Sequence, residues 1–161
     1  MVTIVSVLVA DQFTKFIVKT NLRIGESVPS EGLVRITHGA NSGTAFGLLS
    51  NQTTFLIVAS LIAIGFLVYF YRVYALPKPI LRFAIGLQLG GAFGNLLDRL
   101  AFGAVTDFIH VGWWPIFNVA DSSICVGMAT LIGVMLLFDK NPKSDTAVPE
   151  HTTDRADKET G

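Results

Sequence analysis

The stretch Phe55–Tyr71, FLIVASLIAIGFLVYFY, contains no charged side chain. A helix needs about 20 apolar residues to cross the ~30 Å hydrocarbon core of a bilayer, and this stretch approaches that length. Inside a bilayer the backbone must satisfy its own hydrogen bonds, which a helix does within one segment. The stretch therefore predicts a transmembrane helix.

Three other apolar stretches have a similar character, and they occupy Val2–Val18, Leu81–Leu97 and Ile116–Phe138. Half of the 161 residues are hydrophobic (51%), a proportion that is common in membrane proteins and rare in soluble domains of this size. The sequence therefore predicts a mainly α, polytopic membrane protein with four transmembrane helices in one domain, residues 1–138. The formal net charge is zero, which gives no indication of a nucleic-acid partner.

A polar segment, residues 21–52, separates the first two apolar stretches. Within it, Leu33–His38 alternates in the manner of a short strand, and Gly39, Gly43 and Gly47 then indicate a loop. We expect a small β-hairpin or sheet on the membrane surface. Residues 139–161 are polar and charged without apolar periodicity, which predicts a disordered tail.

The basic residues indicate an orientation in the membrane. An even number of spans places both termini on the same side. The linker between the second and third stretches carries Arg72, Lys78 and Arg82 without an acidic residue. Because cytoplasmic loops are enriched in Lys and Arg, we expect both termini in the cytoplasm and the polar segment on the extracytoplasmic face. The bias is modest, since basic residues also occur on that face.

Six ionisable residues lie in or beside the apolar stretches, where a charge is costly and therefore indicates a function. In the expected topology all six lie toward the extracytoplasmic face, at the level of the amides Asn95 and Asn118. The six are Asp11, Lys15, Asp98, Arg99, Asp107 and Asp121.

Some of these residues have a simple structural interpretation. Asp11 and Lys15 are spaced i,i+4 with the acid first, which favours a structural ion pair along a helix. Asn95, Asp98 and Arg99 share roughly one helix face by their spacing. An alternative is that these three merely end the third span at the membrane interface.

Asp107 and Asp121 form the candidate catalytic pair. Taken singly, Asp107 could be a loop carboxylate after a turn at Gly103, and Asp121 an ordinary carboxylate favoured by a helix N-terminus. Two carboxylates brought together in a poorly solvated site share one proton. The ionised one can draw a proton from water while the protonated one donates to the carbonyl oxygen under attack. This chemistry indicates an aspartyl protease.

Other hydrolytic chemistries lack residues to support them. The sequence has neither HExxH nor GxSxG, and no His/Cys partner lies near His110 at metal-ligand spacing, so we expect no metal and no cofactor. The single cysteine, Cys125, lies in an apolar run and is expected to be a small core residue. Trp113 and Trp114 suit an interfacial aromatic belt, and a role in gating the substrate is the alternative. A small transporter or proton channel with intramembrane carboxylates remains the alternative function.

Five short motifs together resemble the bacterial lipoprotein signal peptidase family (signal peptidase II). They occur in the family's order against the four apolar stretches, and the resemblance covers nearly the whole chain except the tail. The motifs are DQFTK at 11–15, NSGTAFG at 41–47, GAFGNLLDR at 91–99, VTDFI at 105–109 and FNVAD at 117–121.

The resemblance implies a four-helix protease of the bacterial inner membrane, multi-pass and with its active site near the extracytoplasmic face. It implies that lipidated prolipoprotein signal peptides are cut before a diacylglyceryl-modified cysteine, that membrane lipids surround the enzyme and that globomycin inhibits it. We expect a monomer. The family's catalytic aspartates match Asp107 and Asp121, and its supporting polar residues match Asp11, Lys15, Asn41, Asn95, Arg99 and Asn118.

Overall fold

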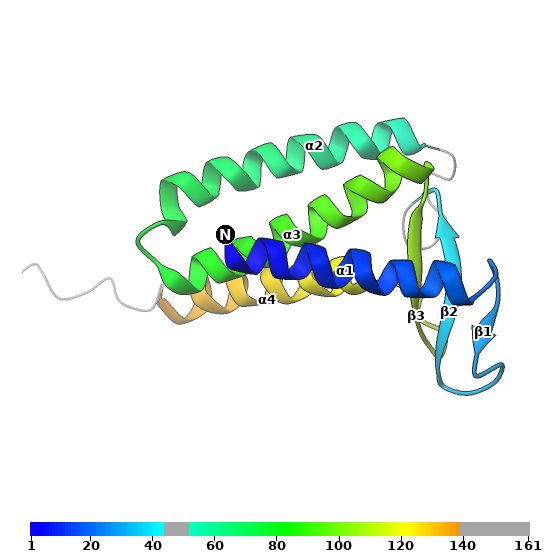
Figure 1. The fold of residues 1–161 in the computed structure, drawn as a ribbon. Coiled ribbons are helices and arrows are strands. Elements are labelled where there is room, and N and C mark those ends of the chain that lie inside the picture. The colour runs from blue at the N-terminus through cyan, green and yellow to red at the C-terminus, as the bar shows by residue number, and fades with distance from the viewer. Residues whose placement is uncertain (44–51, 139–161) are drawn as a thin grey trace, which may run out of the picture.

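The computed structural model describes residues 1–43 and 52–138. The predicted tail at 139–161 lies outside these residues, as does Gly47 of the predicted loop. Four long helices run alongside one another, and a small sheet lies at one end of the bundle (Figure 1). The elements are α1 (Val2–Asn21), β1 (Ser27–Val28), β2 (Val34–Asn41), α2 (Thr53–Phe70), the π-helix η1 (Tyr71–Ala75), α3 (Pro79–Phe102), β3 (Val105–Val111) and α4 (Val119–Phe138).

The central helix, α3, is bounded by residues suited to its two ends. Pro79 opens it, since a first-turn residue needs no N–H partner and proline presets the helical φ. Gly103 closes it in the left-handed conformation, with φ 72°, where a residue without Cβ is favoured. The Thr53 hydroxyl donates to the Gly103 carbonyl oxygen at 2.7 Å, which ties the start of α2 to the end of α3.

Three of the helices are long and apolar enough to cross a membrane: Thr53–Ala75, Pro79–Phe102 and Val119–Leu137. The helix α1 is of similar length but carries Asp11, Lys15 and Lys19. The prediction of a mainly helical chain with a small sheet is confirmed. Of the four predicted spans, three are long and apolar enough to cross a membrane among the described residues.

The distribution of polarity in the bundle is reversed relative to a soluble protein. Large apolar side chains point outward, among them Phe16, Ile62 and Leu137. In contrast, Asp11 and Lys15 are among the most buried residues, and Asp98, Asn95 and Asn118 are buried with them. This arrangement suits a bilayer, where the apolar exterior meets lipid and polar groups must find partners inside.

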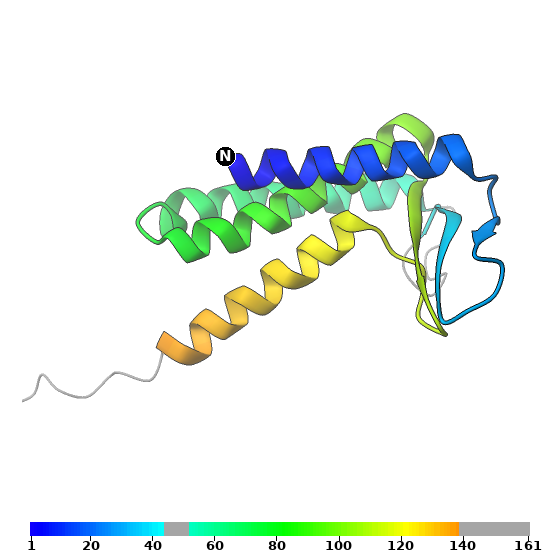
Figure 2. The same ribbon diagram turned by 60° about the horizontal axis from the view of Figure 1, so that its bottom comes forward.

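The sheet has the order β1-β2-β3 and is antiparallel throughout. Viewed from another side, it closes the end of the bundle away from the start of α1 (Figure 2). The predicted strand Leu33–His38 was too short, because β2 continues past an irregularity between Ile36 and Gly39 and pairs with β3 up to Asn41. The prediction that the loop begins at Gly39 was therefore wrong, because Gly39 belongs to β2.

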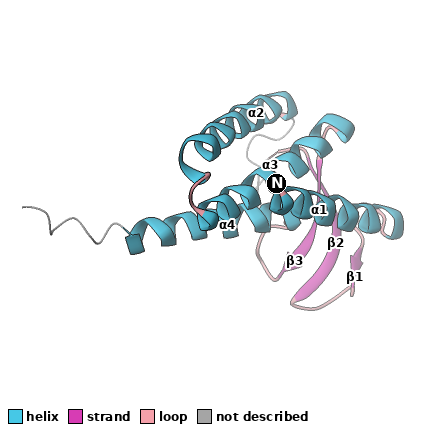
Figure 3. Cartoon of the chain, turned by 60° about the vertical axis from the view of Figure 1, so that its left-hand side comes forward, coloured by secondary structure: helices cyan, strands magenta, loops and turns pink. Residues whose placement is uncertain are grey.

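The strand β3 was not predicted from the sequence, although it carries Asp107. Val105 to Phe108 are all buried, so both faces of the strand are covered and no alternation marks it. In the structure β3 pairs with β2 across the register Gly39↔Asp107, and the cartoon in Figure 3 shows the two strands side by side. Asp107 is thus a residue of the sheet and not of a surface loop.

Glycines allow α3 and α4 to pack closely. A Cβ at Gly91 would meet the carbonyl oxygen of Ala120. A Cβ at Gly127 would lie 2.6 Å from the Ala84 carbonyl oxygen and 2.8 Å from Gln88 Cγ. At Gly133, further along α4, a Cβ would have no neighbour within 4 Å. Helix association in membranes relies on such small-residue contacts.

We expect Gly127→Ala to destabilise the protein by about 1–3 kcal/mol, because the new methyl group overlaps α3 backbone and must push the helices apart. Gly133→Ala is the matched control, and it should be neutral or stabilise by up to about 1 kcal/mol through helix propensity. Thermal unfolding of the purified variants in detergent measures both. Equal midpoints for the two variants would contradict the packing of α4 on α3.

Candidate active site

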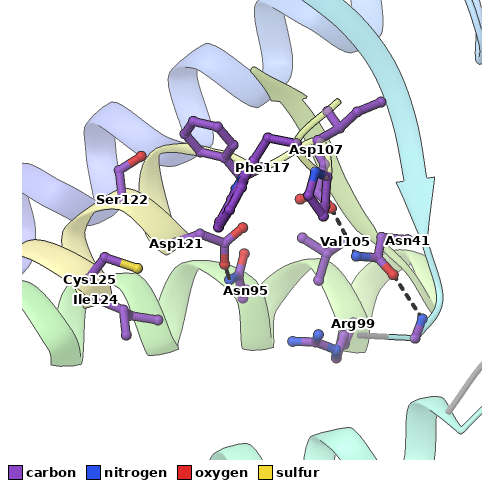
Figure 4. A pocket seen from close by; sticks show the side chains of 14 residues that line it. Asn41, Asn95, Arg99, Val105, Asp107, Phe117, Asp121, Ser122, Ile124 and Cys125 are labelled. Atoms are coloured by element: carbon purple, nitrogen blue, oxygen red, sulfur yellow. Dashed lines mark hydrogen bonds between the residues drawn. The ribbon is translucent and has the colours of Figure 1, made fainter. Parts of the chain in front are cut away.

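A cavity of about 560 Å³ lies where the sheet meets α3 and α4. Figure 4 shows Asp107 approaching it from β3 and Asp121 from α4. Both candidate catalytic residues therefore line one cavity, although they belong to different elements. The lining residues are Asn41, Gly43, Asn95, Arg99, Val105, Asp107, Trp114, Pro115, Ile116, Phe117, Asp121, Ser122, Ile124 and Cys125.

The Asp107 carboxylate is held at both oxygens by amide groups. Asn41 Nδ2 donates to Oδ2 at 2.9 Å, and Asn118 Nδ2 donates to Oδ1 at 2.7 Å. Asn41 reaches this position because it ends β2, beside the part of β3 that carries Asp107. The side chain is therefore fixed in orientation before any substrate binds.

Burial raises the pKa of Asp107 to about 6. The hydrogen bond from Asn41 opposes this rise, the nearby negative charge of Asp121 adds to it, and the hydrogen bond from Asn118 again opposes it. Because two carboxylates interact in one site, their protons belong to the pair. Asp107 can therefore bind or release a proton near neutral pH, as acid–base chemistry requires.

Asp121 lies in the first turn of α4 and is positioned by two asparagines. Asn95 Nδ2 donates to Asp121 Oδ1 at 2.7 Å. Asn118 Oδ1 accepts from the Asp121 backbone N–H at 2.9 Å, and the Asn118 N–H donates back to Oδ2 at 3.3 Å, in the reciprocal manner of a capping box. Asn118 thus contacts both aspartates and sets their relative position.

A buried cation lies behind the two asparagines. Lys15 Nζ contacts Asp11 Oδ2 at 2.8 Å and Asp98 Oδ2 at 3.3 Å, and it donates to Asn95 Oδ1 at 3.0 Å. Only 1% of the Lys15 side chain is exposed. Asn118 Nδ2 also donates to Asn95 Oδ1, at 3.1 Å. An uninterrupted chain of polar contacts therefore runs from Lys15 to both candidate catalytic residues.

Asp11 connects three helices. Besides its ion pair with Lys15, its Oδ1 accepts from the Ala120 N–H at 2.9 Å, so a carboxylate of α1 caps the start of α4. A Cβ at Gly94 would lie 2.5 Å from Asp11 Oδ2, and this glycine therefore lets Asp11 approach α3. The ion pair predicted from the i,i+4 spacing of Asp11 and Lys15 is present. Its two residues also hold α1 against α3 and α4.

Asn95, Asp98 and Arg99 do not act as one group. Asn95 and Arg99 line the cavity, whereas Asp98 is fully buried behind it. Asp98 Oδ2 accepts from the Thr106 N–H at 2.9 Å, which anchors the start of β3 to α3. Arg99 brings the cavity a positive charge, and its Nε has no hydrogen-bond partner among the described residues.

Several lining residues were not identified from the sequence. The prediction that Cys125 is a core residue was wrong: it is exposed and lines the cavity. Its i,i+4 spacing from Asp121 places both on one face of α4, which is the signal that could have identified it. Trp114, assigned to an aromatic belt, lines the cavity as well, whereas its neighbour Trp113 is 86% exposed.

The cavity has the groups that hydrolysis without a metal needs. Two carboxylates, one guanidinium and amide donors lie against an apolar wall formed by residues such as Ile116 and Phe117. Within residues 1–43 and 52–138, no three His, Cys, Asp or Glu side chains cluster in a way that would hold a metal ion. The arrangement can activate a water molecule and stabilise the charge that develops on an attacked carbonyl.

Comparisons with known proteins agree on one family. The sequence model of the family "Signal peptidase (SPase) II" matches residues 3–137. A lipoprotein signal peptidase of Bacillus velezensis is 40% identical over 144 residues, covering 86% of this chain and 94% of that protein. One from Moorella thermoacetica is 40% identical over 132 residues, covering 81% and 88%.

Solved structures show the same relationship. A bacterial membrane enzyme solved by the in meso method at 2.3 Å resolution superposes with a TM-score of 0.80 at 37% identity, covering 89% of this chain and 92% of that one. A second, at 1.9 Å resolution, gives a TM-score of 0.76 at 37% identity, covering 87% and 92%. From the family match over residues 3–137 and these identities over most of each protein, this membrane-embedded chain belongs to the signal peptidase II family.

Proposed function

We propose that the protein is an aspartyl protease of the bacterial inner membrane that removes signal peptides from prolipoproteins, cutting before a diacylglyceryl-modified cysteine. Asp107 and Asp121 are its catalytic pair. The observation that carries the proposal is their position in one cavity, each bonded to Asn118, in a chain whose relatives are lipoprotein signal peptidases.

Hydrolysis follows from the two carboxyl groups. The ionised aspartate takes a proton from a water molecule while the water oxygen bonds to the scissile carbonyl carbon, and the protonated aspartate donates to the carbonyl oxygen. The tetrahedral intermediate then collapses: the aspartate that is now ionised takes the proton of one hydroxyl group as the carbonyl re-forms, the C–N bond breaks, and the departing nitrogen takes the proton held by the other aspartate. The pKa of about 6 for Asp107 suits a group that exchanges protons in this way.

The remaining polar residues support this chemistry in different ways. Asn41, Asn95 and Asn118 orient the carboxylates through the hydrogen bonds they donate. Arg99 offers a cation to the substrate backbone or to the developing oxyanion. Asp11, Lys15 and Asp98 have a structural role, since they lie buried behind the cavity.

The arrangement of the helices supports a multi-pass topology. We infer that α1 forms a fourth span, because it packs along α3 and α4 with apolar side chains such as Phe13 facing outward. The start of α1 and the α2–α3 connection lie at the end of the bundle opposite the sheet (Figure 1). This suits cytoplasmic termini, an active site near the extracytoplasmic face and a single domain, residues 1–138, acting as a monomer among membrane lipids.

The comparisons give no support to a transporter or proton channel, the alternative that the sequence left open. The buried charges also gather near the sheet, beside one cavity, and do not line a path along the bundle. A transport pathway places its binding groups near the middle of the bilayer.

Lipid dependence is the most direct test of the substrate. We expect the purified enzyme to cleave a diacylglyceryl-modified prolipoprotein at least about tenfold faster than its unmodified form, since buried acyl chains fix the depth of the scissile bond. The measurement is a comparison of initial rates in detergent, with mass spectrometry of the new N-terminus. Equal rates, or cleavage away from the modified cysteine, would contradict the proposal.

The aspartyl mechanism predicts that Asp107→Asn and Asp121→Asn each lower kcat by at least about 100-fold, because each removes one proton-transfer group. Asn is close to Asp in size, so both variants should remain folded in detergent. The matched control is Glu31→Gln, which neutralises an exposed carboxylate between β1 and β2 and should leave turnover unchanged. If either folded Asp variant turned over substrate within threefold of the unmodified enzyme, Asp107 and Asp121 could not be the catalytic pair.

A further inference from the structure

A second, apolar compartment lies beside the active site. In Figures 1 and 3, α3 runs between α2 and α4, and both helices pack on it. Between them is a groove of about 420 Å³. Its lining residues are Ala63, Phe66, Leu67, Phe70, Gln88, Ala92, Ile124, Met128 and Leu131.

Gln88 is the one polar side chain among the residues that line this groove. It is 4% exposed, and its Nε2 has no hydrogen-bond partner among the described residues. A buried amide donor without a partner is destabilising, so it indicates a place where a bound molecule supplies the acceptor.

The groove lies next to the catalytic cavity. Ile124 lines both, and it follows Asp121 by one helical turn on α4. Along α3, Gln88 precedes Asn95, which bonds to Asp121, by seven residues, or about 10 Å at 1.5 Å per residue. A molecule held in the active site can therefore extend past Ile124 to Gln88.

We propose that this groove binds one acyl chain of the substrate's diacylglyceryl group, and that Gln88 Nε2 donates a hydrogen bond to its ester carbonyl. The inference rests on the proposed function. About eight bonds separate the scissile carbonyl carbon from an ester carbonyl carbon on the modified cysteine, and at roughly 1.2 Å per bond they span about 10 Å. That length is close to the rise of about 10 Å along α3 from Gln88 to Asn95, seven residues at 1.5 Å per residue.

The size and chemistry of the groove favour an acyl chain over a peptide helix. A helix is about 10 Å wide with a 5.4 Å pitch, so a groove of about 420 Å³ encloses only about one turn. The backbone carbonyl groups of a helix already accept hydrogen bonds within the helix, so a helix offers Gln88 no free backbone acceptor. An acyl ester instead combines a thin apolar chain with one free acceptor, which is what one amide in an apolar groove can recognise.

Two forms of one lipidated prolipoprotein test the hydrogen bond: the natural diacyl ester and a dialkyl ether that lacks the carbonyls. The unmodified enzyme should prefer the ester by roughly two- to tenfold in kcat/KM, the range for one hydrogen bond. Gln88→Leu should abolish that preference. Leu is similar in size and apolar, so this variant should fold.

A second variant tests whether an acyl chain occupies the groove. Ala63→Trp places a large side chain in the groove and should raise KM for long-chain substrates while sparing short-chain ones. Ile62→Trp is the control, because it lies on the same helix, is 69% exposed and does not line the groove.

The outcomes separate this inference from the function on which it rests. Loss of the ester preference in Gln88→Leu, with a chain-length effect in Ala63→Trp only, supports it. No ester preference in the unmodified enzyme would overturn it. Equal slowing of lipidated and unlipidated substrates by Ala63→Trp would also overturn it, since the groove would then hold a bilayer lipid or the signal peptide. Failure of the unmodified enzyme to cleave the lipidated substrate would instead reject the proposed function.

Discussion

The structure depends on one buried cation, Lys15. An ammonium group removed from water is stable only with charged and hydrogen-bonding partners around it. Asp11 of α1 and Asp98 and Asn95 of α3 supply them, and Asp11 also caps the start of α4. Satisfying this charge therefore fixes three helices relative to one another. The same contacts hold Asn95 where it can orient Asp121.

The reversed polarity of the bundle explains how such a site functions in a membrane. Apolar side chains cover the outside, so the polar groups have only one another as partners. In a poorly solvated cavity, interactions between charges and dipoles are stronger than in water. The amides that hold Asp107 and Asp121 are thus effective orienting groups, and the sheet supplies the strand that brings Asp107 to the helices.

Much of this arrangement follows from the sequence, and the exceptions have physical reasons. Apolar length predicts the helices, and the i,i+4 spacing of Asp11 and Lys15 predicts their ion pair. The sequence pattern does not predict the strand β3, because the strand is buried on both faces and shows no alternation of apolar and polar residues. The contact between Lys15 and Asn95 joins residues far apart in the chain, which no local spacing reveals. The prediction that Cys125 is buried failed because the exterior of a membrane protein is itself apolar, so an apolar run does not imply burial.

The charge of Lys15 holds the helices and the active site together, and a double-mutant cycle between Lys15 and Asp98 tests this role most directly. The measurement is the free energy of unfolding in detergent for Lys15→Met, Asp98→Asn and the double variant. We predict that Lys15→Met loses about 3–5 kcal/mol, because the buried Asp11 carboxylate loses its cation and Asp98 keeps only Lys19, whose Nζ lies 3.6 Å from Asp98 Oδ1. The double variant should lose less than the sum of the single losses, by about 0.5–3 kcal/mol. Losses that simply add, or a Lys15→Met enzyme as stable as the original, would contradict the account.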